Sequence, residues 1–192
     1  MKKLFLLFAF VAFSAHAQIP EAFKKQLEQN GLQFEMPAGY KAVPVIDNGD
    51  LQYSFAIVNE AKTMEVRYSI FSMKPLLDEY KKSLNDPNVT MIDPNKLYIG
   101  INMSNGLNMT GGNETEIASF DPKAVKKEFN ADWGGSSFFE FNCAFGKGWK
   151  YGSAVYLHKI DTADVIVTFM SNDKEKHSDL METAFHSLRF VH

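Results

Sequence analysis

Runs in which apolar residues alternate with polar ones recur along this chain and restrict its fold more than any other feature. A period of two places the apolar side chains of a strand on one face of a sheet. Turn formers such as Asp47-Asn48-Gly49-Asp50 separate successive runs, which favours antiparallel hairpins. The runs predict strands at residues 32–36, 41–46, 51–58, 64–73, 136–145, 149–159 and 163–171, and a short last strand at 188–191.

The run from Ala163 to Ser171 differs from the others because both of its faces are apolar. Val165, Val167 and Phe169 alternate with a second set made of Ile166, Thr168 and Met170. A strand of this kind is typical of a position covered on both faces. We therefore expect it at the centre of the sheet.

Helices are expected between these strands. Pro20 and Gly31 bound one helix, and Asp121-Pro122 begins another that runs to about residue 130. The Asn-rich segment 86–117 fits two structures. Its alternation favours a strand, whereas i, i+4 pairs such as Ile99/Met103 and the helix-ending signal Gly111-Gly112 favour a helix. We adopt the helix. Two further helices are expected at 75–85 and 172–186. The predicted class is α+β, with a mainly antiparallel sheet flanked by helices as an α/β/α sandwich.

The first 17 residues have the three-part pattern of a secretory signal peptide. Lys2-Lys3 precede the ten apolar residues 4–13, and Ala15-His16-Ala17 resembles a cleavage site. The apolar run is shorter than the roughly 20 residues that span a bilayer. We expect a secreted or periplasmic protein without a membrane span, whose single domain comprises residues 18–192.

Charge and cysteine content exclude several classes of protein. The chain after the predicted cleavage carries 18 Lys and Arg against 23 Asp and Glu, a formal net charge of −5. Nucleic-acid binding needs a basic patch, so we expect no nucleic-acid partner. Cys143 is the only cysteine, and no intramolecular disulfide can form. Its alternation with Phe139, Phe141 and Phe145 predicts a buried, inert thiol rather than a nucleophile.

The two ends of the predicted domain carry short structural motifs. A helix precedes Phe34-Glu35-Met36-Pro37-Ala38-Gly39-Tyr40, and the last helix leads into Ser187-Leu188-Arg189-Phe190. This framing resembles the PsbP-like group of secreted α/β/α sandwich proteins. The resemblance implies an antiparallel sheet with helices on its faces, and a binding or assembly role more often than an enzymatic one. It implies no catalytic residue.

Known catalytic and metal-binding motifs do not occur in the sequence, so no catalytic residue, metal ligand or cofactor is predicted. His158 is expected in a turn, and His177 and His186 are expected near the surface of the last helix, on opposite sides of it. The acids of the turn around Asp161 and Asp164 are expected to serve the backbone.

Aromatic residues near glycine-rich turns are the remaining candidates for a ligand site. Exposed rings on such loops can stack on sugars, peptides or apolar ligands, although they can equally close the ends of a core. Asp132 beside Trp133 is the first choice, because an acid and two glycines flank the ring. The predicted ligand-binding residues are Asp132, Trp133, Trp149, Tyr151 and Tyr40.

These features favour an exported, non-enzymatic binding or accessory module, acting as a monomer or homodimer on an unknown protein or small molecule. A hydrolase with an unrecognised active site is the alternative. A subunit that assembles through an open sheet edge is a third possibility.

Overall fold

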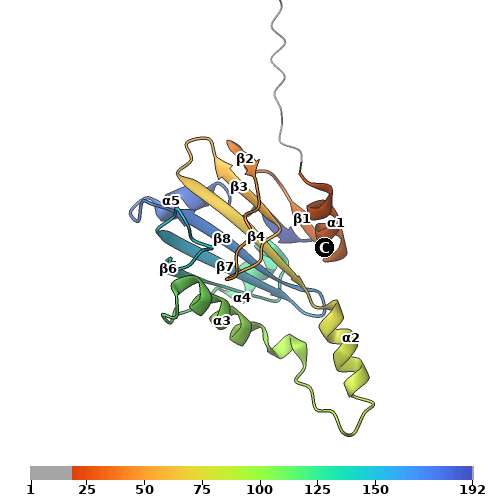
Figure 1. Cartoon of the computed structure of the whole chain (residues 1–192). Helices are drawn as coiled ribbons and strands as arrows, with labels where there is room; N and C mark the ends of the chain where they lie inside the picture. Colours follow the sequence, from red (N-terminus) through yellow and green to blue (C-terminus); the bar gives the residue numbers. More distant parts are fainter. Residues whose placement is uncertain (1–18, 192) are drawn as a thin grey trace, which may run out of the picture.

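A seven-stranded antiparallel sheet forms the centre of the molecule, in the strand order β2-β3-β4-β8-β7-β6-β5 (Figure 1). The computed structural model describes residues 19–191, so the predicted signal peptide at 1–17 lies outside the described residues. In chain order the elements are α1 (Glu21–Gln29), β1 (Leu32–Phe34), β2 (Tyr40–Val43), β3 (Phe55–Asn59), β4 (Met64–Ser72), α2 (Lys74–Ser83), the 3-10 helix η1 (Pro94–Lys96), α3 (Tyr98–Thr110), β5 (Ala118–Ser119), α4 (Pro122–Phe129), β6 (Trp133–Glu140), β7 (Tyr151–Lys159), β8 (Ala163–Ser171), α5 (His177–Glu182) and β9 (Leu188–Phe190).

The expectation for the doubly apolar strand is confirmed. β8 is the fourth of the seven strands, and each of its residues is buried. Val165, Val167 and Phe169 face one core, and Ile166 and Met170 face the other. The sheet pairs β4 with β8, which joins the two halves of the chain.

The two faces of the sheet are covered by different elements. On the first face, side chains of α1, α4 and the α5 region pack on the strands, among them Phe23, Phe129 and Ala184. β1 and β9 form a separate antiparallel pair whose Leu32 and Phe190 join the same core. On the second face, α3 and two long loops cover the strands. The α+β class with helices flanking a mainly antiparallel sheet is confirmed.

Several predicted strand boundaries were wrong. The strand predicted at 51–58 begins only at Phe55, because Asn48 Oδ1 accepts the backbone N–H of both Asp50 and Leu51 and holds this part of the chain in a turn. The strand predicted at 136–145 spans Trp133–Glu140 instead. Trp133 is therefore a strand residue opposite His158, not a residue of a glycine-rich turn.

The predicted helices exist, with differences at their ends and faces. Asp121 caps α4 as expected, accepting the backbone N–H of Lys123 and Ala124 at 3.0 Å. The helix predicted at 172–186 contains regular α-helix only at His177–Glu182, with turns around it. In α2, Leu77 is buried, whereas Leu76 and Leu84, at the end of the helix, are exposed.

A buried arginine fastens the two long loops to the second face of the sheet. Arg67 on β4 is 4% exposed and its Nε lies 2.6 Å from Glu65 Oε1. Its guanidinium lies over the rings of Tyr53 and Phe145, 4.8 Å from each centroid, and donates to the carbonyl of Phe145. Trp149 Nε1 donates to Glu65 Oε2 at 3.3 Å. The loops before β3 and before β7 are thus held to one ion pair.

Candidate functional site

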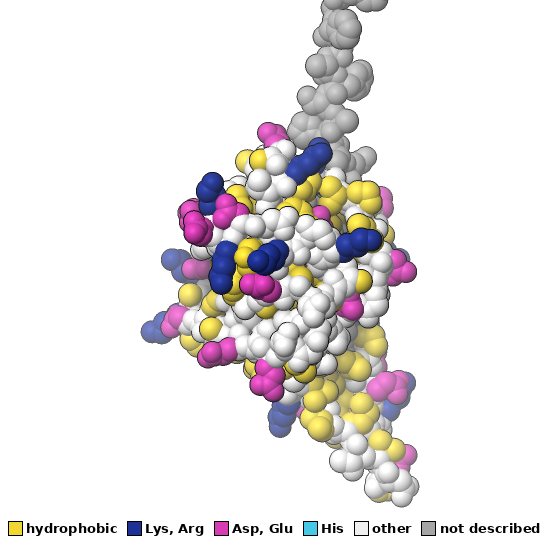
Figure 2. All heavy atoms as spheres, turned by 60° about the vertical axis from the view of Figure 1, so that its left-hand side comes forward, with side chains coloured by type: hydrophobic (Ala, Val, Ile, Leu, Met, Phe, Trp, Pro, Cys, Tyr) yellow, Lys and Arg dark blue, Asp and Glu magenta, His cyan; other side chains and the backbone are white. Residues whose placement is uncertain are grey.

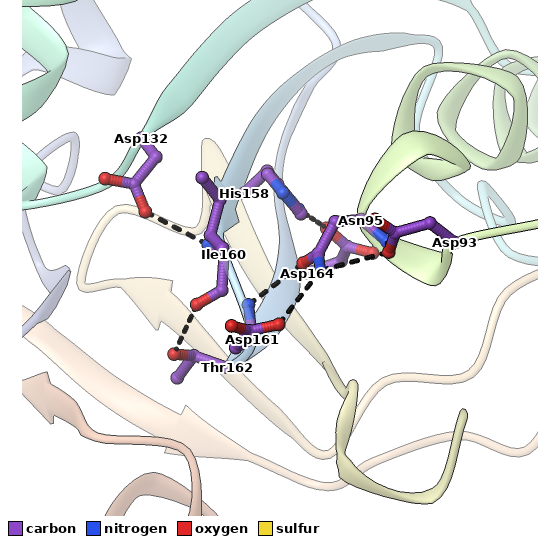
Figure 3. Close-up of polar contacts among 8 residues, drawn as sticks. All are labelled: Asp93, Asn95, Asp132, His158, Ile160, Asp161, Thr162 and Asp164. Atoms are coloured by element: carbon purple, nitrogen blue, oxygen red, sulfur yellow. Dashed lines mark hydrogen bonds and ion pairs between the residues drawn. The ribbon is translucent and has the colours of Figure 1, made fainter. Parts of the chain in front are cut away.

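Helix α3 is bounded by local sequence signals and is fixed to the fold at its beginning. Asp93 caps η1 by accepting the backbone N–H of Asn95 at 2.9 Å, and η1 leads directly into α3. Asn95 then makes two 2.9 Å hydrogen bonds with Asp161 in the β7–β8 turn, donating to its carboxylate and accepting its backbone N–H (Figure 3). Asp161 has a φ of 58°, which this tight turn requires.

A buried histidine supports the first residue of α3. Tyr98 stacks on His158 with ring centroids 4.2 Å apart and planes inclined by 11°. His158 Nδ1 lies 2.7 Å from Asp164 Oδ1, and both residues are buried near the β7–β8 turn. The expectation that His158 lies in a turn was wrong, because it is a residue of β7 under Tyr98. The acid expected to serve the backbone, Asp164, instead orients this imidazole.

The other end of α3 is fixed as well. Gly111 adopts the left-handed conformation that ends a helix, with a φ of 67°. Asn142 N donates to the carbonyl of Met109 at 3.1 Å, and Asn108 Nδ2 donates to the carbonyl of Asp50 at 3.3 Å. Met109 is fully buried. Because both ends are anchored, α3 presents its remaining surface in a defined orientation.

The side of α3 that faces the sheet carries one large apolar residue, Met109, among polar and small ones. Asn102, Gly106 and Thr110 are buried beside it. A side chain at Gly106 would lie 2.6 Å from Thr115 Oγ1 and 4.0 Å from Tyr156 Oη, so only glycine fits there. The sheet beneath also carries hydroxyls, with Ser137 Oγ 3.0 Å from Tyr156 Oη. Gly106 therefore allows this side of α3 to lie close to Thr115 and to the sheet.

The solvent-exposed part of α3 carries four large apolar side chains. Ile99, Ile101, Met103 and Leu107 are 38–51% exposed, and we name this exposed set the outer face of α3. At 100° per residue, Met103 and Leu107 lie along one border of the exposed surface and Ile101 along the other. No charged residue occurs between residues 97 and 113. An ordinary surface helix turns most of its large apolar side chains toward the core, whereas α3 buries only Met109 among those named here. Exposed apolar side chains gathered on one element mark interaction sites.

The apolar surface extends into the segment before α3, which projects from the sheet together with α2 (Figure 1). Nine of the 14 large hydrophobic residues that are exposed in the described part of the chain lie between residues 76 and 107. Figure 2 shows hydrophobic side chains gathered on this projecting part. Those before α3 are Leu76, Leu84, Val89, Met91 and Ile92.

Asp132 and Trp133, the first choice from the sequence, are held by the fold. Asp132 accepts Lys126 Nζ at 3.0 Å through one oxygen and the backbone N–H of Ile160 at 3.0 Å through the other. Burial raises the pKa of this carboxyl, but the two donors outweigh burial and the pKa lies below its usual value. Trp133 packs on the second core, and its ring centroid lies 5.0 Å from that of Tyr98.

The other sequence candidates are also partly buried and make internal contacts. Trp149 donates to Glu65, as described above. Tyr40 donates its hydroxyl to the carbonyl of Leu180 at 3.4 Å, and burial raises its pKa. Tyr151 begins β7 opposite Glu140, and Lys150 Nζ lies 5.0 Å from its ring centroid.

The structure does not gather these five candidates into one site. Asp132 and Trp133 lie beside the last residues of β7, and Trp149 and Tyr151 lie at its beginning. A strand of nine residues separates such ends by about 25 Å. Tyr40 is on β2, at the far edge of the sheet. The sequence missed the outer face of α3, because its i, i+4 pairs indicate a helix but not the direction in which they point.

His177 forms the closest approach to a catalytic pair in the described residues. Ser171 Oγ donates to the carbonyl of Asp173 at 3.2 Å, so it must accept the hydrogen bond from His177 Nδ1–H at 2.7 Å. With the proton on Nδ1, His177 Nε2 accepts the hydroxyl of Ser153 at 3.0 Å. This spacing suits a nucleophile and its base. However, Ser153 and His177 are only 8% and 3% exposed.

These contacts instead anchor α5 on β7 and β8, and the expectation of a surface position for His177 was wrong. Burial lowers the pKa of its imidazole, which favours the neutral form that the two serines require. His186, in contrast, is exposed and lies 3.0 Å from Glu128.

Other features of the described residues indicate no further site. Among residues 19–191, no three His, Cys, Asp or Glu side chains are placed to share a metal ion, and no helix has the length and apolarity needed to cross a membrane. Open hollows of about 210–570 Å³ lie along α2, α4 and α5, and none of them is lined by the five sequence candidates.

Comparison with known families adds no assignment: no protein-family model matches the chain, and no curated protein matches it.

Proposed function

We propose that this protein is an exported, non-enzymatic binding or accessory module whose contact surface is the outer face of α3. The observation that carries the proposal is the exposure of four large apolar side chains on one helix, Ile99, Ile101, Met103 and Leu107, while only Met109 anchors it in the core. Burial of one such side chain is worth about 1.5–3 kcal/mol. Because the four side chains are 38–51% exposed, the isolated chain forgoes roughly half of that free energy at each position, and a partner that covers them recovers it.

The anchoring of α3 supports a contact role. A surface that is already ordered loses less conformational entropy when a partner binds. The contacts of Asn95, Tyr98 and Met109 hold both ends of the helix. The predicted signal peptide and the resemblance to PsbP-like proteins suggest that the partner is met outside the cytoplasm.

A hydrolase remains the alternative, and Ser153 with His177 is the pair that it would use. Their burial favours the binding role, because a nucleophile must meet its substrate. Ester, glycoside and peptide substrates should all be left intact by the protein. Turnover that disappears in Ser153→Ala, with the variant still folded, would support the hydrolase instead.

Site-specific photo-crosslinking in an exporting host tests the proposed surface. Benzoylphenylalanine is placed at Leu107 on the outer face of α3, and at Ile46 as a control, since Ile46 is exposed and apolar but lies elsewhere. We expect a defined protein adduct from position 107 alone, which Met103→Glu in the same chain removes. Equal adducts from both positions, or none from position 107, would contradict the proposal.

A further inference from the structure

We infer that the partner of the outer face of α3 is a second copy of this chain, bound so that the two α3 helices run antiparallel about a two-fold axis near Ser104. This inference rests on the proposed function and names the partner for that surface. Ser104 is exposed and lies at the midpoint of α3, with Ile101 and Leu107 on either side of it, so a two-fold axis there places Ile101 of each copy against Leu107 of the other. Such an isologous contact is the commonest form of association between identical subunits.

Gly100 gives the first reason to expect another backbone close to this helix. Glycine inside a helix costs roughly 1 kcal/mol relative to alanine. Gly106 has an internal reason for its identity, since a side chain there would clash with Thr115. Gly100 has none, because a Cβ there would meet nothing within 4 Å. It lies on the exposed side with Ser104, one turn away, where small residues let a second helix approach.

The distribution of charge around α3 selects the antiparallel arrangement. The helix itself is uncharged, so two copies bring no like charges together along it. Exposed Lys96 precedes it, and exposed Glu114 and Glu116 follow it. Antiparallel pairing brings Lys96 of each copy toward the two glutamates of the other copy. Parallel pairing would instead bring the two lysines together at one end and the four glutamates together at the other. The helix dipoles also oppose each other favourably in this arrangement.

The same charges argue against a lipid surface as the occupant. Helices that lie on anionic membranes carry Lys and Arg along their polar side. Here no Lys or Arg occurs between Lys96 and Lys123. The outer face of α3 therefore offers apolar contact without the cations that would attract lipid head groups.

Mass measurement of the chain from Gln18 to His192 tests the inference directly. Sedimentation equilibrium over a range of concentrations should give a reversible monomer–dimer equilibrium. Leu107→Glu should shift it at least tenfold toward monomer, because each dimer would hold two buried carboxylates, and thermal unfolding of the dissociated variant should show an intact monomer fold. The matched control Ile46→Glu should leave the dissociation constant unchanged.

Charge reversal tests the antiparallel geometry. Lys96→Glu should weaken the dimer several-fold, and adding Glu114→Lys and Glu116→Lys to that variant should restore it. A triple variant no better than Lys96→Glu would overturn the arrangement.

Three outcomes would overturn self-association itself. The first is a wild-type chain that stays monomeric at every concentration. The second is a monomeric chain whose Leu107 photo-adduct is a different protein, which would leave the proposed function standing. The third is a monomeric chain that binds vesicles of equal parts phosphatidylethanolamine and phosphatidylglycerol through α3.

Discussion

Replacement of Trp133 by alanine decides between a ligand-stacking ring and a ring that holds the fold together. Trp133 packs on the second core, its centroid lies 5.0 Å from that of Tyr98, and its ring edge would lie 3.1 Å from a Cβ at Gly135. A fully buried large aromatic costs about 3–5 kcal/mol when truncated to alanine. Trp133 is only partly buried, so we place Trp133→Ala at about 2–3 kcal/mol of unfolding free energy.

The aromatic pair gives this prediction a second, independent number. A tilted pair contributes about 0.5–1.5 kcal/mol beyond its buried area. A double-mutant cycle of Trp133→Ala with Tyr98→Ala should therefore show a coupling of that size. For a domain of this length, a loss of about 2–3 kcal/mol lowers the melting temperature by roughly 4–12 °C.

Urea unfolding followed by circular dichroism and by tryptophan emission measures both quantities. Trp149 is the only other tryptophan, so the variant retains one reporter in the second core. A loss below about 1 kcal/mol, or a coupling near zero, would refute the reasoning from packing and return Trp133 to the list of candidate ligand contacts.

Four further predictions follow from the cores and the buried polar groups. Val167→Asp should cost several kcal/mol, because it leaves an unpaired charge in the central strand, and a melting temperature near wild type would contradict this. Arg67→Ala should lower the unfolding free energy by about 3–5 kcal/mol, since it leaves the carboxylate of Glu65 without its cation, and urea titration measures the loss. Burial depresses the pKa of His177, so the neutral imidazole contributes its full stability above the ordinary pKa of about 6.5. That contribution is lost as the pH falls from there through the lower pKa of the folded state. His177→Gln should therefore flatten the fall in unfolding free energy between pH 7 and pH 5. Burial also raises the pKa of the Cys143 thiol, so labelling with a thiol reagent should be slow in the native state and fast in urea, and rapid native labelling would count against a sheltered thiol.

The position of Cys143 differs from the expectation in both its element and its burial. Its alternation with Phe139, Phe141 and Phe145 predicted one continuous strand and a buried, inert thiol. β6 ends at Glu140, because the chain then turns so that Phe145 can reach Asp50 and Arg67. Cys143 is only partly buried in that loop.

If the outer face of α3 is a contact surface, the fold has separated structural and interaction roles between its two sides. The first face carries the larger apolar core under α1, α4 and the α5 region. The second face has a smaller apolar core to which Met109 of α3 contributes, and Arg67 and the ring of His158 hold the elements that cover it. The remaining apolar side chains of α3 lie outside this core.

The sequence by itself determined the class of fold and its central strand. Period-two alternation depends only on the geometry of one strand, so the run from Ala163 to Ser171 identified a strand buried on both faces before any partner was known. Capping is equally local, and Asp121 and Gly111 therefore mark helix ends that the structure retains.

Only the tertiary structure decided which residues form a candidate site. The pairing of β4 with β8 joins segments about 100 residues apart, which no local pattern in the sequence specifies. The direction of α3 depends on how Gly106 and Met109 fit against the second face, which the helix's own residues do not specify. Helical periodicity identifies the faces of α3, but the surface on which the helix packs determines which face remains in solvent.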